Sequence, residues 1–159
     1  MKADLKISAF LANVPMFRDA SPEELARIEA GTAVVHAERG HVVFQRGDPA
    51  PGFHIVVYGQ VKLGVSTGAG ADKVIEILGP GATFGEAVMF LDKPYPVYAQ
   101  TLEDSLLLRV SQAAVFDELD RSGTFARKML AGLSQRLHAL LADVEAYSLR
   151  SGTQRVIGY

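Results

Sequence analysis

The sequence has no cysteine among its 159 residues. Without a thiol, the chain can form no disulfide, no thiolate zinc site, no cysteine-ligated iron–sulfur cluster and no cysteine nucleophile. An excess of charge of one sign is also missing, because 16 basic and 18 acidic residues leave a net charge of −2. A domain that binds nucleic acid on its own shows a basic surface, so we do not expect this sequence to bind DNA by itself.

Long apolar runs are missing too. No stretch approaches the roughly 20 residues that a membrane-spanning helix needs. The start, MKADLKISAFLANV, is too short and too interrupted by charge for a signal peptide. We therefore expect a cytoplasmic protein with no membrane partner. Hydrophobic residues nevertheless make up 48% of the sequence, which is enough for one compact domain with an appendage and excludes disorder as the main state.

The periodicity of the sequence changes near residue 30. Residues 3–30 have a helical pattern that is interrupted at Pro15, and Ser21-Pro22-Glu23-Glu24 has the form of a capping box that starts a second helix. After Thr32 the pattern is one of short β-rich runs separated by Gly, Pro and Asp. These runs cover residues 32–36, 41–45, 53–67, 73–78 and 97–110. The sequence therefore predicts a mainly β fold with flanking helices, an antiparallel sandwich or jelly roll.

A long helix is predicted at the end of the chain. Ser111 is a candidate N-cap for a helix over residues 111–119, and a longer helix follows from residue 124. Apolar residues in this longer helix are spaced 3, 4, 3, 4 and 3, as in a heptad seam: Leu130, Leu133, Leu137, Leu140, Val144 and Tyr147. We therefore expect residues 124–149 to pair in a homodimer. The alternative is a helix packed flat on its own β domain.

Two glycine-containing blocks stand at the predicted turns. Gly40, Gly47 and Gly59 lie between apolar strands, where turns must close. Gly85-Glu86 lies at the head of a short helix-like segment, whose backbone N–H groups favour an anion. In their joint order, these blocks resemble the cyclic-nucleotide-binding β-roll of the Crp/Fnr family of bacterial transcription regulators. The resemblance covers about residues 15–157.

The resemblance implies a double-stranded β-helix jelly roll and a division of the chain. Residues 1–123 would form the effector sensor, residues 124–152 the dimerisation helix that also covers the effector pocket, and residues 153–159 a hinge. In this family a helix-turn-helix DNA reader follows the hinge, and the sequence ends about where that reader would begin. The expected protein is thus the sensor part of a transcription regulator, which would contact DNA only through the absent C-terminal domain.

The sequence departs from the family at the phosphate site. The cyclic-nucleotide binders of the family hold the ribose with the Glu of the Gly-Glu pair and the cyclic phosphate with an Arg about ten residues later. Glu86 is present, but residues 91–101 contain no arginine, and the next one is Arg109. A buried phosphate needs a bidentate, charge-assisted partner. Cyclic AMP is therefore not the expected effector.

The segment from Glu86 to Asp92, with Pro94 and residues 133–138, is similar to the branch of the family that includes haem-dependent nitric-oxide sensors of denitrification. That resemblance implies a flat apolar cofactor such as haem, which His138 would ligate, although a solvated or hydrogen-bonded helix histidine remains the alternative. The full set of predicted effector-binding residues is Phe84, Gly85, Glu86, Ala87, Val88, Pro96, Val97, Tyr98, Leu137, His138 and Leu141. In this set, residues 96–98 would form an apolar wall that faces the long helix.

Other chemistry finds little support in the sequence. His36, His41 and His54 are expected to be ordinary surface or edge histidines, and none has the spacing of a cupin metal site. No Ser-His-Asp order and no Gly-x-Ser-x-Gly elbow occurs, so we do not expect an enzyme. Two alternatives stay open beside the expected sensor. One is a cyclic-nucleotide-binding domain, and the other is a structural dimerisation module whose pocket is filled by its own side chains.

Overall fold

The structure is a computed structural model that describes the backbone of residues 6–158 and the side chains of residues 6–144. The chain begins with a helical segment, as predicted, made of α1 (Ile7–Ala12), the 3-10 turn η2 (Pro15–Phe17) and α2 (Pro22–Ala30). The capping box is confirmed: the Ser21 hydroxyl accepts from the Glu24 N–H at 3.1 Å, and the Glu24 carboxylate accepts from the Ser21 N–H at 2.7 Å.

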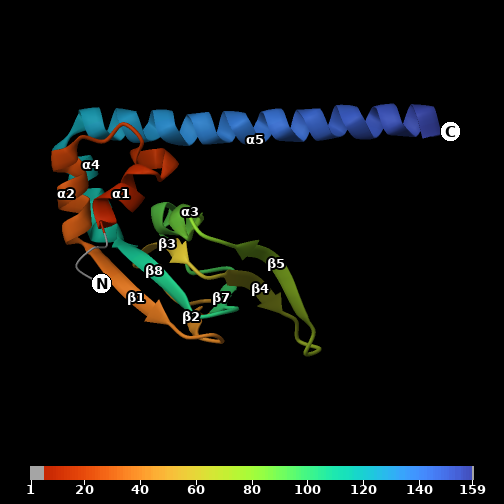
Figure 1. Cartoon of the computed structure of the whole chain (residues 1–159), viewed down its shortest axis with the longest axis horizontal. Coiled ribbons are helices and arrows are strands. Elements are labelled where there is room, and N and C mark those ends of the chain that lie inside the picture. The colour runs from red at the N-terminus through yellow and green to blue at the C-terminus, as the bar shows by residue number, and fades with distance from the viewer. Residues whose placement is uncertain (1–5, 159) are drawn as a thin grey trace.

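Two antiparallel four-stranded sheets follow and form the predicted jelly roll (Figure 1). One sheet has the order β1-β8-β3-β6 and the other the order β2-β7-β4-β5. The strands are β1 (Thr32–Ala37), β2 (Val42–Phe44), β3 (Gly52–Tyr58), β4 (Val61–Ser66), β5 (Asp72–Leu78), β6 (Thr83–Phe84), β7 (Tyr98–Thr101) and β8 (Ser105–Ser111). A short helix, α3 (Glu86–Leu91), connects β6 to the second half of the roll.

The core has two parts. One cluster packs the N-terminal helices and the start of the long C-terminal helix against strands β3 and β8, with the rings of Phe17, Phe53 and Phe125 at its centre. The other cluster fills the roll between the two sheets. Strand β5 is an exception because it forms an edge, and its residues Val74, Ile75 and Ile77 are all exposed. Strand β5 thus leaves three large apolar side chains outside the two core clusters.

Two helices end the chain. Ser111 caps α4 (Gln112–Arg121) by accepting from the Ala114 N–H at 3.0 Å, as predicted. The long helix α5 (Gly123–Gly158) begins one residue before the expected start. Its backbone is helical through residues 153–158, where the sequence predicted a hinge. No proline interrupts this segment, so the backbone hydrogen bonding of the preceding turns can continue through it. No described helix is long and apolar enough to cross a bilayer.

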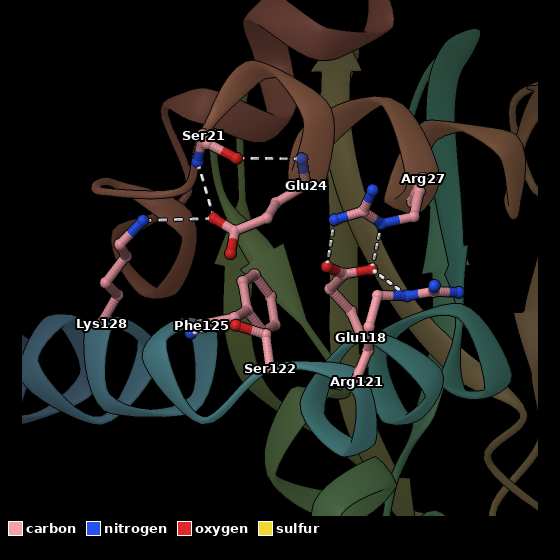
Figure 2. A network of polar contacts seen from close by, with 8 residues as sticks. All are labelled: Ser21, Glu24, Arg27, Glu118, Arg121, Ser122, Phe125 and Lys128. Atoms are coloured by element: carbon pink, nitrogen blue, oxygen red, sulfur yellow. Dashed lines mark hydrogen bonds and ion pairs between the residues drawn. The ribbon is translucent and has the colours of Figure 1, made fainter.

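Ion pairs attach the start of α5 and the end of α4 to α2 (Figure 2). The buried Glu118 carboxylate of α4 accepts from the Arg27 Nε and Nη2 groups at 2.7 and 2.8 Å. Lys128 of α5 donates to Glu24 at 3.3 Å. Bidentate pairing of this kind fixes both distance and orientation, so the first turns of α5 have a defined position on the N-terminal helices.

Further along α5, the helix crosses η2 in direct backbone contact. Gly132 is buried at this crossing, and a Cβ atom there would overlap the carbonyl oxygen of Pro15 and lie 3.1 Å from the Met16 Cα. Only glycine permits this approach, because every other residue would separate the two backbones. The crossing therefore decides how close α5 lies to the roll.

This contact leads to a first prediction. Gly132→Ala should lower the free energy of unfolding by about 1–3 kcal/mol, because the added methyl group has no space at the crossing. Urea unfolding followed by circular dichroism measures the change. Gly123→Ala is the matched control, since it lies in the same helix and its added methyl group would meet nothing within 4 Å. Alanine in a helix is otherwise favourable, so a Gly132→Ala variant as stable as the control would contradict the close crossing.

Candidate functional site

A pocket of about 310 Å³ lies between the roll and α5. Strands β4, β5 and β6, the turn before β6, the start of α3, η2 and α5 all contribute to its walls. Its lining residues are Pro15, Leu63, Glu76, Leu78, Gly81, Ala82, Thr83, Phe84, Gly85, Glu86 and Arg136. A volume near 300 Å³ is at the lower end of the range for pockets that bind small molecules. The pocket is therefore suited to a small ligand that touches both the roll and the helix.

The Gly-Glu pair of the predicted effector site lies in this pocket. Gly85 has φ of +91°, a left-handed conformation that residues with a side chain rarely adopt, and α3 starts directly after it. This turn places Glu86 at the pocket wall, half-buried, where its carboxylate accepts a hydrogen bond from the Thr83 hydroxyl. The hydrogen bond restrains one carboxylate oxygen, and the remaining lone pairs are left for a ligand.

Only three of the predicted effector-binding residues line the pocket, namely Phe84, Gly85 and Glu86. Val88 and Val97 pack against the core of the roll. Tyr98 faces the β4–β5 hairpin, where its hydroxyl donates to Asp72 at 2.7 Å. The remaining predicted residues are exposed and outside the pocket lining: Ala87, Pro96, Leu137, His138 and Leu141. Residues 96–98 thus do not form the apolar wall that the sequence suggested.

Arg136 is one of the pocket residues that sequence reasoning missed, and its side chain is exposed. It projects from α5 one turn after Gly132, so the close crossing at η2 brings it next to the roll. Glu76 of β5 was missed as well. Within residues 6–144, neither Arg136 nor Glu76 has a hydrogen-bond or ion-pair partner. Arg136 lies three residues after Leu133 and therefore on the same face of the helix. This spacing would have placed Arg136 near the roll only if Leu133 had been known to pack inward.

His54 is buried, and the expectation of an edge histidine was wrong. It lies on β3, a central strand of its sheet, between β8 and β6. Its ring stacks on Phe84 at 5.0 Å and lies 6.0 Å from the ring of Phe44, and its Nδ1 atom has no hydrogen-bond partner. Burial, with a smaller contribution from the charge of Arg109, lowers the pKa of His54 from 6.5 to about 4. His54 is therefore neutral at physiological pH.

Tyr95 adds a further ring beside Phe44. Tyr95 stacks on Phe44 with 3.5 Å between ring centroids, and its hydroxyl points at the carbonyl oxygen of Gly52, 3.5 Å away. Burial raises the pKa of Tyr95, and the nearby Asp48 carboxylate adds to this effect. The rings of Phe84, His54, Phe44 and Tyr95 thus form a row of neighbouring rings, stacked in the two outer pairs and tilted between His54 and Phe44. A ligand that moves Phe84 would press directly on this row.

The other three histidines are exposed. His36 and His41 are exposed, as the sequence predicted, and so is His138. Across the part of the chain that the structure describes, no group of three or more His, Cys, Asp or Glu side chains is placed to hold a metal ion.

The predicted heptad seam divides into two parts. Leu133 packs against the helical core of its own chain, next to Met129 and Phe125. The remaining seam residues with described side chains are each more than half exposed, as is the neighbouring Leu141: Leu130, Leu137, Leu140 and Val144. Tyr147 belongs to the same predicted seam but lies outside the residues whose side chains the structure describes. Between Leu137 and Val144, α5 thus presents an apolar face that its own domain does not cover.

Comparison with known proteins adds a family. Residues 34–122 match the family model of the cyclic nucleotide-binding domain. The CRP-like cAMP-activated global transcriptional regulator of Mycobacterium tuberculosis is 27% identical over 127 residues, which are 80% of this chain and 57% of that protein. The cyclic AMP receptor protein of Thermus thermophilus is 25% identical over 147 residues, 89% of this chain and 66% of that protein. The chain thus spans less than two thirds of both curated relatives.

Solved structures give the same picture. The crystal structure of DNR from Pseudomonas aeruginosa has a TM-score of 0.82 and 34% identity, and covers 96% of this chain and 68% of its own. The crystal structure of the sensor domain of the transcriptional regulator DNR has a TM-score of 0.73 at 34% identity, and covers 86% of this chain and 91% of its own. The likeness thus includes the roll and reaches into the long helix.

The buried imidazole predicts a pH-dependent stability. Its pKa is about 4 in the folded state and near 6.5 when unfolded, so between these values the unfolded state binds more protons. The free energy of unfolding is therefore unaffected by protonation of His54 above about pH 6.5 and decreases as the pH falls from there towards 4. We expect His54 to account for about 2 kcal/mol of the loss between pH 7 and pH 5.

Urea unfolding of wild type and His54→Phe at a series of pH values measures this contribution. The variant should lose less stability than wild type across this range, because phenylalanine does not titrate. His36→Phe is the control, since it removes an exposed histidine and should leave the wild-type pH dependence intact. Parallel curves for wild type and His54→Phe would show that the imidazole is not held neutral.

Proposed function

Because the chain belongs to the cyclic nucleotide-binding domain family, among the Crp/Fnr-type regulators, we propose that it is the effector-sensing and dimerisation part of a transcription regulator. One observation supports this most directly. The pocket that holds the Gly-Glu pair is closed on one side by α5, the same helix that carries the uncovered apolar face. The full-length protein would bind DNA through a C-terminal reader domain, and a cytoplasmic location suits that role.

The mechanism follows from this shared helix. A ligand in the pocket touches the roll through Glu86 and the helix through Arg136. A ligand shifts an equilibrium between two positions of the helix only if it binds one position better than the other. Contacts to both walls supply such a difference, because they strengthen when the helix approaches the roll. The helix would pass this shift to its partner and to the DNA readers.

The second copy would bind along the exposed side of α5. Four leucines and a valine within residues 130–144 are more than half exposed, and a soluble chain rarely leaves such a continuous apolar stripe uncovered. Four of them, Leu130, Leu137, Leu140 and Val144, are spaced 7, 3 and 4 residues apart, which fits positions of a two-chain heptad seam. We therefore propose a homodimer through residues 124–149, with Leu133 contributing to its own domain instead.

Cyclic AMP is not the proposed effector, although the Mycobacterium tuberculosis relative is described as cAMP-activated. The segment between Glu86 and β7 supplies no arginine in this chain. The guanidinium that does reach the pocket comes from α5, and two carboxylates accompany it. A cyclic phosphate would thus meet repulsion as well as attraction, without a bidentate partner built into the roll.

A haem-dependent response to nitric oxide, as in denitrification, is the finer function that the family resemblance implies. The described residues do not fit a haem in this pocket. No histidine lines it, and His138 is exposed on α5 outside it. The apolar lining from Leu63, Leu78 and Phe84 is accompanied by two carboxylates and a guanidinium, and covering these charges with an apolar macrocycle would cost free energy. We therefore derive no step through haem.

The alternative of a purely structural dimerisation module has less support. Its pocket would be filled by the protein's own side chains, whereas a space of about 310 Å³ lies open between the roll and α5. Enzymatic activity forms no part of the proposal.

The dimer proposal predicts the effect of a charge in the seam. Leu137→Asp should convert the dimer into a monomer, because the carboxylate would be buried without a partner at the interface. Leu137 is exposed within one chain, so the fold itself should be unaffected. Sedimentation velocity measures the molecular mass, and circular dichroism verifies the fold.

Ala131→Asp serves as the control for this variant. It adds the same charge to the same exposed helix, outside the predicted seam, and should leave the dimer intact. An unchanged dimer in Leu137→Asp would show that the seam assignment is wrong.

The effector proposal is tested by two titrations of the wild-type protein. Calorimetry with cyclic AMP should give no saturable heat, because the phosphate lacks its arginine. Titration with hemin should give no saturable shift of the Soret band in the wild-type protein, with or without nitric oxide. His138→Ala should give the same spectra as wild type. Binding of cyclic AMP in the micromolar range would overturn the argument from the missing arginine. A Soret band that depends on His138 would restore the haem hypothesis.

A further inference from the structure

We infer that the pocket binds a small zwitterion of the amino-carboxylate class, with the ligand carboxylate on Arg136 and the ligand ammonium on Glu86 and Glu76. This inference rests on the proposed function, because it names the class of effector for the same pocket. Three features of the pocket support it: the signs of its charges, its size, and the position of Arg136 between two hollows.

Charges of both signs meet in this pocket from elements far apart in the sequence. Glu76 comes from β5, Glu86 from the start of α3 and Arg136 from α5. Among residues 6–144, no ion pair joins Arg136 to either carboxylate, and only Glu86 has a hydrogen-bond partner, the Thr83 hydroxyl. A ligand with one positive and one negative group would pair with all three charges at once.

The balance of charge separates this class from others. The two carboxylates and one guanidinium give the lining a net charge of −1. A plain anion would leave both carboxylates unpaired next to it, and a plain amine would leave Arg136 unpaired. A zwitterion avoids both costs, because each end lies opposite a group of the other sign.

The size of the pocket limits the ligand. A volume of about 310 Å³ accommodates a molecule of amino-acid dimensions. The apolar lining from Leu63, Leu78 and Phe84 lies on the roll side of the pocket and could contact an aliphatic or aromatic side chain. The ligand class is therefore an amino acid or a close analogue whose side chain is apolar.

The position of Arg136 connects the ligand to the helix. A second hollow of about 270 Å³ adjoins the first, lined by Pro15, Arg18, Gly132, Gln135, Arg136 and Ala139. Pro15 and Arg136 belong to both hollows, so the exposed Arg136 side chain borders the two spaces. The backbone one turn earlier is fixed by the Gly132 crossing. A ligand carboxylate would thus draw the guanidinium to the pocket side and hold α5 against the roll.

The test is a panel titration of the wild-type chain. Thermal melts with each of the common amino acids at millimolar concentration identify which zwitterions stabilise the fold, and calorimetry measures their affinity. We expect at least one amino acid with an apolar side chain to bind. The amine without the carboxylate and the acid without the amino group should each bind at least about tenfold more weakly.

Matched variants assign the binding to the pocket. Arg136→Gln should weaken the zwitterion at least about tenfold, since it removes the partner of the carboxylate. Glu86→Gln should weaken it as well, through the ammonium. Arg127→Gln is the control, because Arg127 is exposed on the same helix and lines neither hollow. The affinity of this variant for the zwitterion should equal that of wild type.

The outcomes separate this inference from the proposed function. If a ligand of another class binds and Arg136→Gln leaves its affinity unchanged, the zwitterion inference is wrong and the sensor function stands. If zwitterions bind equally to wild type and to Arg136→Gln, the assignment of the carboxylate is wrong. If no amino acid stabilises the fold while Leu137→Asp still breaks the dimer, the inference fails and dimerisation remains.

Discussion

The backbone contact between Gly132 of α5 and Pro15 of η2 is the constraint on which the arrangement of this chain depends. It brings two main chains closer than any side chain would allow, and so it sets the height of α5 above the roll. Arg136 lies one turn later and reaches the pocket for that reason. The ion pairs of Lys128 and Arg27 fix the segments on the N-terminal side of the same crossing. The same backbone contact thus determines both the position of α5 and the shape of the pocket.

The fold was largely predictable from local patterns, because turn residues and alternating apolar runs determine strands directly. Strand β6 was missed, since two residues carry no pattern and form a strand only by pairing with His54 and Ile55 of β3. The environment of His54 was misjudged for a similar reason. Whether a histidine lies on an edge or in the centre of a sheet depends on strand order, which Crp/Fnr resemblance implies in outline but residue spacing does not show.

The candidate site was predictable only where it is local in sequence. Gly85 and Glu86 lie in one turn, and the sequence identified them. Glu76 and Arg136 come from other elements, and their place in the pocket follows from the pairing of β5 with β4 and from the crossing of α5. The predicted wall at residues 96–98 failed because Val97 turns into the core and Tyr98 turns towards Asp72. Family position alone does not determine which way these side chains point.

The uncovered edge of the roll has a consequence for the chain in solution. Strand β5 has a free hydrogen-bonding side, and Val74, Ile75 and Ile77 are exposed along it. An apolar edge strand is a template for pairing with strands of other molecules and thus for aggregation. Lys73 precedes Val74 and Ile75, and Glu76 separates them from Ile77, so a stacked sheet would take the hydration from both charges. The colloidal behaviour of the protein should therefore depend on the charged side chains of a single strand.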